Sequence, residues 1–596
     1  MHVVATAGHV DHGKSTLVRA LTGTDPDRLA EERKRGLSIE LGYAWMRLGE
    51  LGDRGGAGDR GGAGEVAFVD VPGHERFLAT MLAGVGPVPV ALLIVAADDP
   101  WMPQAAEHLA ALDALGVEHG LVVITRADLA SAADSAAARA RALDEVSRTS
   151  LAGAEAVVVS AVTGAGLDEL RSALSGLLAR VPTADPDAPV RLWVDRRFHV
   201  RGAGTVVTGT LPAGTITVGD TLVGPDGERV RVRGLEALGL ARTTMTGPAR
   251  VALDLGGRAP ESIGRGTPLL TEGRYGVTRV VDVLLRGGEA VPQRPQLHIG
   301  SASTSVHARP LAEGLCRLVL DEPLPLRAGD RAVLRDPGAR TVWGARVLDP
   351  APPELRRRGA AAARAEALRR LDGSVAAYLA MRGLARRSDL DLLGLAGDLS
   401  QDTVVAGDWL VSPAQAARLR VALEQQVAAA GRDGLTPAAA AHGMGLPDPA
   451  IAETLVGDQL EYVRGRIRRA GAAELPAALA GALERLRALL GEHPFDAPTA
   501  DELADARVDD HTIAALHRAG LVLRLAPGVV VLPDAPDLAV ARLGELPQPF
   551  TTSQARQALG TSRRVALPLL GHLDATRRTV RLADDTRRLT RPSVLG

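Results

Sequence analysis

The sequence predicts a multidomain chain that begins with an α/β domain, continues through two β-barrels and ends in tandem helical modules closed by hairpins. Three observations support this prediction. The chain has 596 residues, apolar runs alternate with helical patterns near the N-terminus, and alanine-, leucine- and arginine-rich helical segments follow Pro350. Because one hydrophobic core rarely organises so long a chain, several domains are expected.

The composition is that of an ordinary soluble globular protein, with 46% apolar residues, 23% charged residues and a net charge of -2. Bulk charge therefore does not indicate a nucleic-acid partner. The apolar run Val88–Ala97 is too short to cross a bilayer, and the first residues lack the pattern of a signal peptide. We expect a cytoplasmic protein with no membrane partner. The lone Cys316 is interpreted as a small buried hydrophobe.

The N-terminal 180 residues carry the pattern of a parallel α/β sheet. A tandem DRGGAG repeat at 53–64 interrupts the pattern, and we interpret it as a disordered surface-loop insertion without chemistry. The predicted strands lie at 3–8, 66–71, 90–96, 121–125 and 156–160.

The first predicted strand leads into GHVDHGKS, which matches the phosphate-loop pattern G-x-x-x-x-G-K-S between a strand and a helix. In this pattern backbone N–H groups surround the phosphates, Lys14 reaches the β- and γ-phosphates, and Ser15 is a Mg²⁺ ligand. Lys14 and Lys34 are the two lysines of an arginine-rich chain, which favours a chemical role for Lys14. The predicted phosphate-loop residues are Gly8, His9, Val10, Asp11, His12, Gly13, Lys14, Ser15 and Thr16.

A second motif, VAFVDVPGH at 66–74, runs from a predicted strand into a loop. Asp70 at the strand end is predicted to orient the Mg²⁺ shell through water, and the N–H of Gly73 to meet the γ-phosphate. His74 stands where a side chain can orient the attacking water, so we assign it the catalytic role. The alternative is a simple surface histidine.

The segment EERKRGLSIELG at 31–42 is predicted to be a first switch loop. The hydroxyl of Ser38 would join the Mg²⁺ shell when the γ-phosphate is present. Ordering and disordering of this loop would then carry the signal.

The choice of base is predicted from TRAD at 125–128 and from the residues after the next apolar strand. The Asp128 carboxylate can accept hydrogen bonds from the N1 and N2 donors of guanine, which adenine does not present, and the Arg126 stem can lie flat on the ring. The predicted ligands are therefore GTP and GDP with Mg²⁺. The predicted base-binding residues are Thr125, Arg126, Asp128, Ser160 and Ala161.

A proline-rich linker at 181–189 is followed by short strand-like runs and glycine turns that fit two small β-barrels. From Pro350 onward, about 245 residues show a helical pattern that repeats roughly every 60 residues. This repeat predicts four winged-helix modules, and the alternative is one irregular helical domain. The predicted boundaries are 1–180 for the α/β P-loop GTPase domain, 190–272 and 273–350 for the barrels, and 351–412, 413–474, 475–536 and 537–596 for the winged helices.

Three motifs, GHVDHGKS, DVPGH and SAVTG (160–164), together resemble the translational GTPases of the elongation factor Tu type, whose G domain is followed by β-barrels. Residues 197–220 are similar to the first of those barrels, so the resemblance extends from residue 1 to about 350. The TRAD box is close to the Thr-Lys-x-Asp of selenocysteine-specific factors rather than to the Asn-Lys-x-Asp of elongation factor Tu. Ser38 stands where most members of the superfamily carry threonine.

Selenocysteine-specific factors also place an aspartate–arginine pair at the start of the first barrel and an arginine before a later strand. Asp195, Arg196 and Arg250 match those positions, which implies a selenocysteine pocket. A selenol is an anion at neutral pH and a seryl hydroxyl is not, so fixed guanidinium groups favour the selenium form. The alternative is that these arginines form surface ion pairs.

Residues 551–596 resemble the last winged-helix module of the same family and hold nine arginines, three aspartates and no glutamate. This local excess of positive charge indicates a nucleic-acid surface near an RNA hairpin. The alternative is a solvated arginine-rich face. The predicted RNA-binding residues are Arg556, Arg563, Arg564, Arg577, Arg578 and Arg581.

The resemblance implies a monomeric elongation factor that hydrolyses GTP and delivers selenocysteinyl-tRNA to the ribosome at UGA codons marked by an mRNA hairpin. Two alternatives within the superfamily are a general aminoacyl-tRNA carrier and a regulatory subunit of sulfate adenylylation. A third alternative is a GTP-gated nucleic-acid-binding regulator whose winged helices grip DNA.

Overall fold

The structure is a computed structural model that describes residues 1–26, 40–48, 64–74, 77–99, 101–200, 204–224, 226–256, 261–287, 290–336, 338, 341–395, 397–470, 476–491 and 493–590. The chain forms two units, Met1–Met381 with Ala385–Ser400, and Arg382–Leu384 with Gln401–Gly596. The predictions for Ser38 and for the repeat at 53–63 lie outside the described residues.

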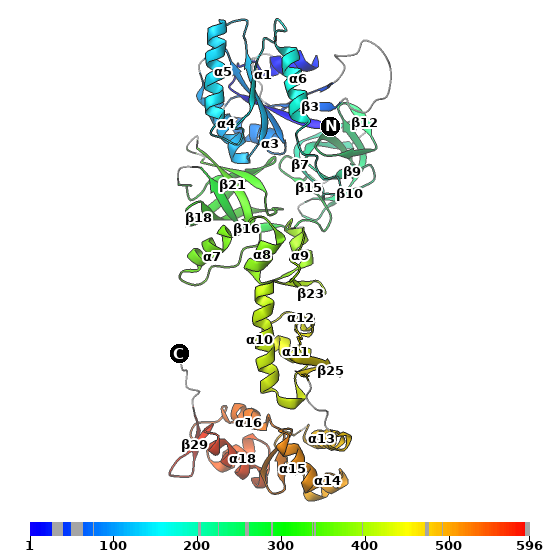
Figure 1. The fold of residues 1–596 in the computed structure, drawn as a ribbon, viewed down its shortest axis with the longest axis vertical. Helices are drawn as coiled ribbons and strands as arrows, with labels where there is room; N and C mark the ends of the chain where they lie inside the picture. The colour runs from blue at the N-terminus through cyan, green and yellow to red at the C-terminus, as the bar shows by residue number, and fades with distance from the viewer. Residues whose placement is uncertain are drawn as a thin grey trace. The chain divides into compact units, whose positions relative to one another are not determined.

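The first unit opens with a six-stranded sheet in the order β2-β3-β1-β4-β5-β6 (Figure 1). Five of these strands coincide with the predicted apolar runs and are parallel. The edge strand β2, which was not predicted, runs antiparallel to β3 and is only partly buried. The bounds are β1 His2–Gly8, β2 Gly42–Arg47, β3 Glu65–Asp70, β4 Val90–Ala96, β5 His119–Thr125 and β6 Glu155–Val158.

Helices cover both faces of this sheet, which explains why every residue of the central strand β4 is buried and apolar. One face packs against α1 and α6, and the other against α3, α4 and α5. The predicted α/β GTPase fold is confirmed. The helices are α1 Lys14–Thr22, α3 Leu78–Val85, α4 Pro103–Leu115, α5 Ala132–Val146 and α6 Leu167–Leu178.

Two β-barrels follow, as predicted. In the first, the order β10-β15-β7-β8-β14-β11-β12 is closed by pairing of β10 with β11. The second closes in the order β16-β19-β18-β17-β20-β21. The first barrel comprises β7 Arg191–Val200, β8 Gly204–Leu211, β10 Thr221–Val223, β11 Arg229–Ala237, β12 Leu240–Arg242, β14 Ala249–Leu255 and β15 Pro268–Thr271. In the same region β9 Thr215–Thr217 and β13 Thr244–Thr246 form a separate two-stranded sheet. The second comprises β16 Thr278–Arg286, β17 Gln296–Ile299, β18 Ala302–Ala312, β19 Leu315–Leu324, β20 Arg331–Arg335 and β21 Val342–Asp349.

A buried ionic network joins the second barrel to the helices α7 (Ala360–Arg369) and α8 (Val375–Arg382), before β22 (Leu384–Arg386) and α9 (Arg387–Leu392). Asp282 accepts hydrogen bonds of 2.7 Å from the Nε atoms of both Arg317 and Arg364. Arg364 also pairs with Asp349, which accepts from the Tyr378 hydroxyl at 2.9 Å. Both carboxylates are fully buried. The barrel and the first helices after it are therefore held together by paired charges.

The second unit is built from helices and four short antiparallel hairpins in its described part. Its C-terminal part is a winged-helix domain, as predicted, whereas the number of four modules stays a prediction. The hairpins are β23 Val404–Ala406 with β24 Trp409–Val411, β25 Leu460–Val463 with β26 Arg466–Arg469, β27 Leu523–Ala526 with β28 Val529–Val531, and β29 Thr579–Arg581 with β30 Arg587–Leu589. The helices are α10 Pro413–Ala429, the 3₁₀ helix η2 Gly431–Asp433, α11 Pro437–Gly443, α12 Pro449–Thr454, α13 Ala477–Leu490, α14 Ala500–Asp505, α15 Asp510–Arg518, α16 Ala535–Leu543, α17 Thr552–Ala558 and α18 Arg563–Ala575.

Among the residues that the structure describes, no helix combines the length and the apolar character that crossing a bilayer requires.

The buried network predicts a large effect of Arg364→Ala. This change removes one arginine partner from each of the buried carboxylates of Asp282 and Asp349 at the contact between the barrel and α7, which we expect to cost about 3–5 kcal/mol. Differential scanning calorimetry of the full chain should show the first unit unfolding at a lower temperature. The control is Arg369→Ala on the same helix, an exposed residue paired with Glu366, whose loss should cost no more than about 1 kcal/mol. Equal shifts for the two variants would contradict a stabilising role for the network.

Candidate functional site

The predicted nucleotide-binding residues lie at one edge of the sheet. Because β1, β3, β4, β5 and β6 are parallel, their carboxyl ends meet there. Gly8, Asp70 and Thr125 are the last residues of β1, β3 and β5, and Ser160 and Ala161 follow β6. The phosphate loop after β1 enters the first turn of α1, so the structure brings together Gly8, His9, Val10, Asp11, His12, Gly13, Lys14, Ser15, Thr16, Asp70, Gly73, Thr125, Arg126, Asp128, Ser160 and Ala161.

The phosphate loop needs glycine where the sequence has it. Gly8 has a φ of 138°, and a Cβ atom there would lie 2.2 Å from the carbonyl oxygen of Ile94. Gly13, directly before α1, has a φ of 78°. The Lys14 ammonium donates to the carbonyl oxygens of His9 at 2.7 Å and of Gly8 at 3.2 Å. The lysine therefore lies across the loop.

Side chains outside the loop hold it in place. His108 Nδ1 on α4 accepts from the Gly8 N–H at 3.0 Å, and Gln104 Oε1, one helical turn earlier, accepts from the N–H two residues further along the loop at 3.5 Å. Thr125 Oγ1 donates to the carbonyl oxygen of His12 at 2.7 Å. Burial lowers the pKa of His108 to about 3, so this imidazole stays neutral and keeps an acceptor nitrogen. Gln104 and His108 were not predicted. They are four residues apart and therefore lie on one face of α4, but only the fold brings this helix to the phosphate loop.

Asp70 and Ser15 form a compact oxygen pair. The fully buried Asp70 carboxylate accepts from Ser15 Oγ at 2.6 Å and from Thr6 Oγ1 at 2.6 Å. A carboxylate and a hydroxyl at the end of a phosphate loop are the oxygen ligands that Mg²⁺ prefers beside phosphate. The donor set of these residues fits the predicted metal.

Gly73 lies directly over the phosphate loop. A Cβ atom there would come within 2.5 Å of both Lys14 Nζ and the backbone nitrogen of Val10. Only glycine permits this approach. The next residue, His74, is half-buried, and its ring centroid lies 6.1 Å from that of Phe77.

The base-binding residues are tied to each other and to the phosphate loop. Arg126, with a φ of 57°, donates to the carbonyl oxygen of Asp11 at 3.3 Å and to the Asp98 carboxylate at 2.5 Å. Asp128 accepts from Ser160 Oγ at 2.6 Å. The two loops that carry the predicted base-binding residues are therefore joined by a direct hydrogen bond.

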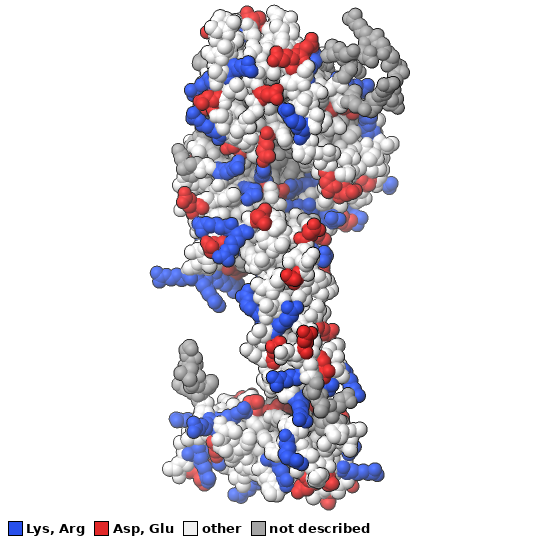
Figure 2. All heavy atoms as spheres, in the orientation of Figure 1, with Lys and Arg blue, Asp and Glu red and all other residues white. Residues whose placement is uncertain are grey.

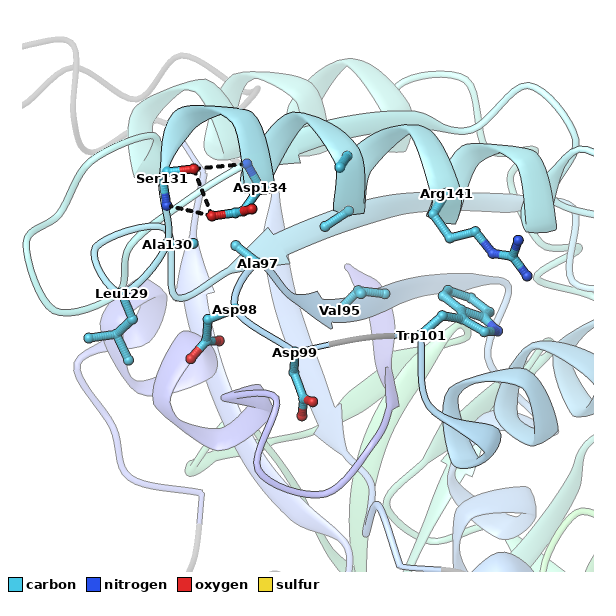
Figure 3. A pocket seen from close by; sticks show the side chains of 12 residues that line it. Val95, Ala97, Asp98, Asp99, Trp101, Leu129, Ala130, Ser131, Asp134 and Arg141 are labelled. Atoms are coloured by element: carbon cyan, nitrogen blue, oxygen red, sulfur yellow. Dashed lines mark hydrogen bonds between the residues drawn. The ribbon is translucent and has the colours of Figure 1, made fainter.

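A pocket of about 530 Å³ lies beside these loops (Figure 3). The loop after β4 lines it with Asp98, Asp99 and Trp101, and the start of α5 lines it from the other side, where Ser131 and Asp134 form a reciprocal helix cap. Figure 3 shows the Asp98 and Asp99 side chains pointing the same way from their loop. The pocket was not predicted from the sequence.

The structure brings the three residues of the predicted selenocysteine pocket together on the first barrel. Arg250 forms two hydrogen bonds with the Asp195 carboxylate, one of 2.7 Å from Nη2, and Thr208 donates to the same carboxylate at 2.7 Å. Asp195 is only 7% exposed. Burial by itself lowers the pKa of Arg250, but Asp195 and Tyr43 raise it above its ordinary value overall, so its charge is permanent.

The GTPase domain contributes the other wall. Tyr43 on β2 lies under both guanidinium groups, with its ring centroid 4.0 Å from Arg250 and 5.1 Å from Arg196. Arg196 donates to the carbonyl oxygen of Leu41 at 2.5 Å and pairs with Glu40 at 3.0 Å. Tyr43, Arg196 and Arg250 border a cavity of about 180 Å³. Burial raises the pKa of Tyr43, whose hydroxyl is buried and has no hydrogen-bond partner among the described residues. Sequence reasoning did not find Tyr43 or Glu40.

The predicted RNA-binding arginines fall into two groups in the last winged helix. Arg563 at the start of α18 and Arg577 and Arg581 near β29 are exposed; Arg581 pairs with Asp585 of the same hairpin. Figure 2 shows basic side chains in the region that Figure 1 labels α18 and β29. Arg556 on α17 is half-buried.

Two other arginines have partners elsewhere in the second unit. Arg564 donates to three carbonyl oxygens, of Ala497 at 2.6 Å, Gly528 at 3.0 Å and Pro498 at 3.1 Å. Arg578 pairs with Asp537 on α16 at 2.5 Å. These contacts give Arg564 a structural part that its position in an arginine-rich helix start did not indicate.

Three regions of the chain match families of known proteins. Residues 1–180 match the elongation factor Tu GTP binding domain, 283–354 the β-barrel domain of selenocysteine-specific elongation factor, and 541–589 the winged helix of elongation factor SelB. The selenocysteine-specific elongation factor of Escherichia coli is 41% identical over 362 residues, which cover 60% of this chain and 56% of that protein. The matched region thus spans little more than half of that relative.

Two further comparisons widen the match. Translation initiation factor 2 subunit gamma of Methanothermobacter thermautotrophicus is 33% identical over 48% of this chain and 73% of its own length. The crystal structure of a bacterial selenocysteine-specific elongation factor, EF-Sec, superposes with a TM-score of 0.68 and 25% identity, and covers 99% of this chain and 100% of that one. The chain is a translational GTPase, and its GTP-binding, barrel and winged-helix regions match those of the selenocysteine-specific elongation factors.

Proposed function

We propose that this protein is a monomeric cytoplasmic GTPase that binds selenocysteinyl-tRNA and delivers it to the ribosome at UGA codons marked by an mRNA hairpin. The observation that carries the proposal is the pocket in which Arg196 and Arg250 meet over Tyr43, next to the end of the predicted switch loop. The names of the curated relatives support the choice of aminoacyl group.

In this proposal Lys14 and the loop N–H groups bind the phosphates of GTP, and Mg²⁺ would be held by Ser15 directly and by Asp70 through water. Held there, it would supply positive charge beside the phosphate oxygens. Gly73 brings its N–H to the γ-phosphate, and His74 orients the attacking water. Ser38, proposed as a further Mg²⁺ ligand, lies outside the described residues.

The pocket discriminates by charge. The buried Asp195 already neutralises Arg250, whereas the partner of Arg196 is Glu40, whose side chain is 50% exposed. A selenolate can take the place of the Glu40 carboxylate at Arg196. A seryl hydroxyl is neutral, so its weaker hydrogen bond does not offset the loss of that ion pair. Because Glu40 lies in the C-terminal part of the predicted switch loop (31–42), loss of the γ-phosphate would alter this contact and release the aminoacyl group.

The base site predicts that Asp128→Asn exchanges one base preference for another. The amide no longer accepts from both N1 and N2 of guanine, so we expect the affinity for GDP to fall by roughly 150- to 20,000-fold, as the loss of two charge-assisted hydrogen bonds requires. Xanthine, with an oxygen in place of the N2 amino group, should bind the variant better than guanine does. Fluorescence titration with labelled GDP and XDP measures both. Asp144→Asn, on the exposed face of α5, is the control and should bind GDP like the wild type. Unchanged GDP affinity in Asp128→Asn would refute the assignment.

Arg196→Ala tests the pocket better than Arg250→Ala, because loss of Arg250 would leave the buried Asp195 carboxylate unpaired. We expect GTP-loaded Arg196→Ala to lose roughly 10- to 150-fold in affinity for selenocysteinyl-tRNA, the value of one charged hydrogen bond, with little change for seryl-tRNA. Ribonuclease-protection titrations with the two charged tRNAs give the ratio. The neighbouring Arg197, which donates to the carbonyl oxygen of Ile263, supplies the control Arg197→Ala. A selenium-to-serine ratio equal to that of the wild type would contradict the pocket, although it would leave GTP binding in place.

The last winged helix is proposed to bind the mRNA hairpin through the exposed residues Arg563, Arg577 and Arg581, which project from a helix start and a wing. Arg564 instead has a structural role, because it donates hydrogen bonds to the carbonyl oxygens of Ala497 and Gly528. The rival, a GTP-gated DNA regulator, would use the same surface for duplex DNA.

The salt dependence of RNA binding tests whether Arg577 and Arg581 contact phosphate groups. Each of Arg577→Ala and Arg581→Ala should reduce the slope of log K against log salt by about 0.7 to 0.9, because one phosphate contact is lost. Fluorescence anisotropy with a hairpin that follows an in-frame UGA codon of the same genome, over a salt series, measures the slope. Arg418→Ala on α10 should leave the slope unchanged. Tighter binding to duplex DNA than to the hairpin would favour the rival.

A further inference from the structure

Among the described residues, one cluster of metal-ligating side chains lies beside the phosphate loop and is not used by the proposed mechanism. It consists of His9 and His12 from the loop and Asp99 from the segment after β4, each offering one ligand atom, and these three atoms all lie within 4.8 Å of one another. The two imidazole rings meet edge to face, with centroids 4.9 Å apart. The cluster therefore joins two loops that are far apart in the sequence.

We propose that His9, His12 and Asp99 form a binding site for a divalent transition metal of the zinc class, with water as the fourth ligand. The distance between His12 Nε2 and Asp99 Oδ2 is 3.3 Å, which is long for a charged hydrogen bond. Zinc bonds of about 2.0–2.1 Å at tetrahedral angles place neighbouring ligand atoms about 3.3 Å apart. His12 and Asp99 are thus already spaced like two ligands of one tetrahedral ion, and the third ligand atom, from His9, lies within 4.8 Å of both.

The chemistry of the three side chains selects the metal. Two imidazoles and one carboxylate match the catalytic type of zinc site, which keeps an open position for water, whereas Mg²⁺ prefers an octahedron of oxygen atoms. Burial lowers the pKa of both His9 and His12, the latter to about 4. The imidazoles are therefore neutral at physiological pH, as metal ligands must be.

Burial and access also suit a bound ion. His12 is fully buried, and Nδ1 of His9 is buried without a hydrogen-bond partner in the described part of the chain. The carboxylate side chain of Asp99 is 32% exposed, which gives an ion a route from solvent. Lys14 lies close to both histidines and opposes binding, so the affinity should be moderate.

The site is distinct from the proposed Mg²⁺ site. There, Ser15 and Asp70 meet at the start of α1 and the end of β3, whereas this cluster uses side chains that contact the segment after β4. The neighbouring Asp98 holds Arg126 of the base box. An ion bound to His9, His12 and Asp99 would therefore fasten the phosphate loop to the segment that positions the base-binding arginine.

Cobalt(II) is the probe, because a tetrahedral Co²⁺ ion is visible by its absorption and zinc displaces it. The full chain, in excess Mg²⁺ so that oxygen-only sites are filled, is titrated with Co²⁺ and then with Zn²⁺. We expect one Co²⁺ per chain with a tetrahedral spectrum that Zn²⁺ abolishes. Asp99→Asn and His9→Asn should each weaken binding by at least about tenfold, since loss of even an outer-shell partner costs that much. Both positions are at least partly exposed, so these variants should fold.

Asp98→Asn is the matched control, because it removes an adjacent carboxylate that the proposed site does not use, and its Co²⁺ affinity should equal that of the wild type. Zinc should raise the unfolding temperature of the wild type and of Asp98→Asn more than that of Asp99→Asn. The proposal is overturned if the wild type shows no tetrahedral Co²⁺ spectrum, or if Asp99→Asn and His9→Asn bind Co²⁺ as tightly as Asp98→Asn does. Neither outcome would affect the proposed binding of GTP or tRNA.

Discussion

The shape of the phosphate loop is fixed by hydrogen bonds from outside it, and the other features of the nucleotide site follow from that shape. His108 on α4 and Thr125 at the end of β5 bind its backbone from two sides, while Lys14 lies across it. Loop N–H groups that are already oriented need little ordering when they bind a charged ligand. The close approach of Gly73 is possible only because the loop and Lys14 occupy defined positions.

The pocket on the first barrel is completed by residues of the GTPase domain. Its arginines belong to the first barrel, but Tyr43, Leu41 and Glu40, which contact them, belong to the GTPase domain. A pocket built across two domains is complete only while both domains keep this arrangement. Because Glu40 and Leu41 are the last residues of the predicted switch loop before β2, the nucleotide and the aminoacyl group would act on neighbouring residues of one segment. This proximity is the physical basis on which GTP hydrolysis can release a tRNA in the proposed mechanism.

Motifs whose residues are close in the sequence were predictable, and contacts set by the tertiary fold were not. The phosphate loop and the five parallel strands carry local signals of spacing and hydrophobicity, and Cys316 was correctly expected to be buried. Tyr43 and Arg250 are more than two hundred residues apart, so no local pattern joins them. Asp99 belongs to none of the motifs in the sequence. Only the packing of the segment after β4 against the phosphate loop brings it to His12.

Arginine shows the same limit most clearly, because one residue type performs three different tasks in this chain. Arg317 and Arg364 are buried counterions of Asp282, Arg564 saturates carbonyl oxygens of the preceding segments, and Arg577 extends into solvent. Composition counts all of them as positive charge, but a guanidinium whose N–H groups already donate to acceptors of the protein has fewer of them left for a phosphate group. The excess of arginine in the last module therefore overstates the surface that we propose to bind RNA. The measure that distinguishes a binding arginine from a structural one is its set of acceptors in the folded chain.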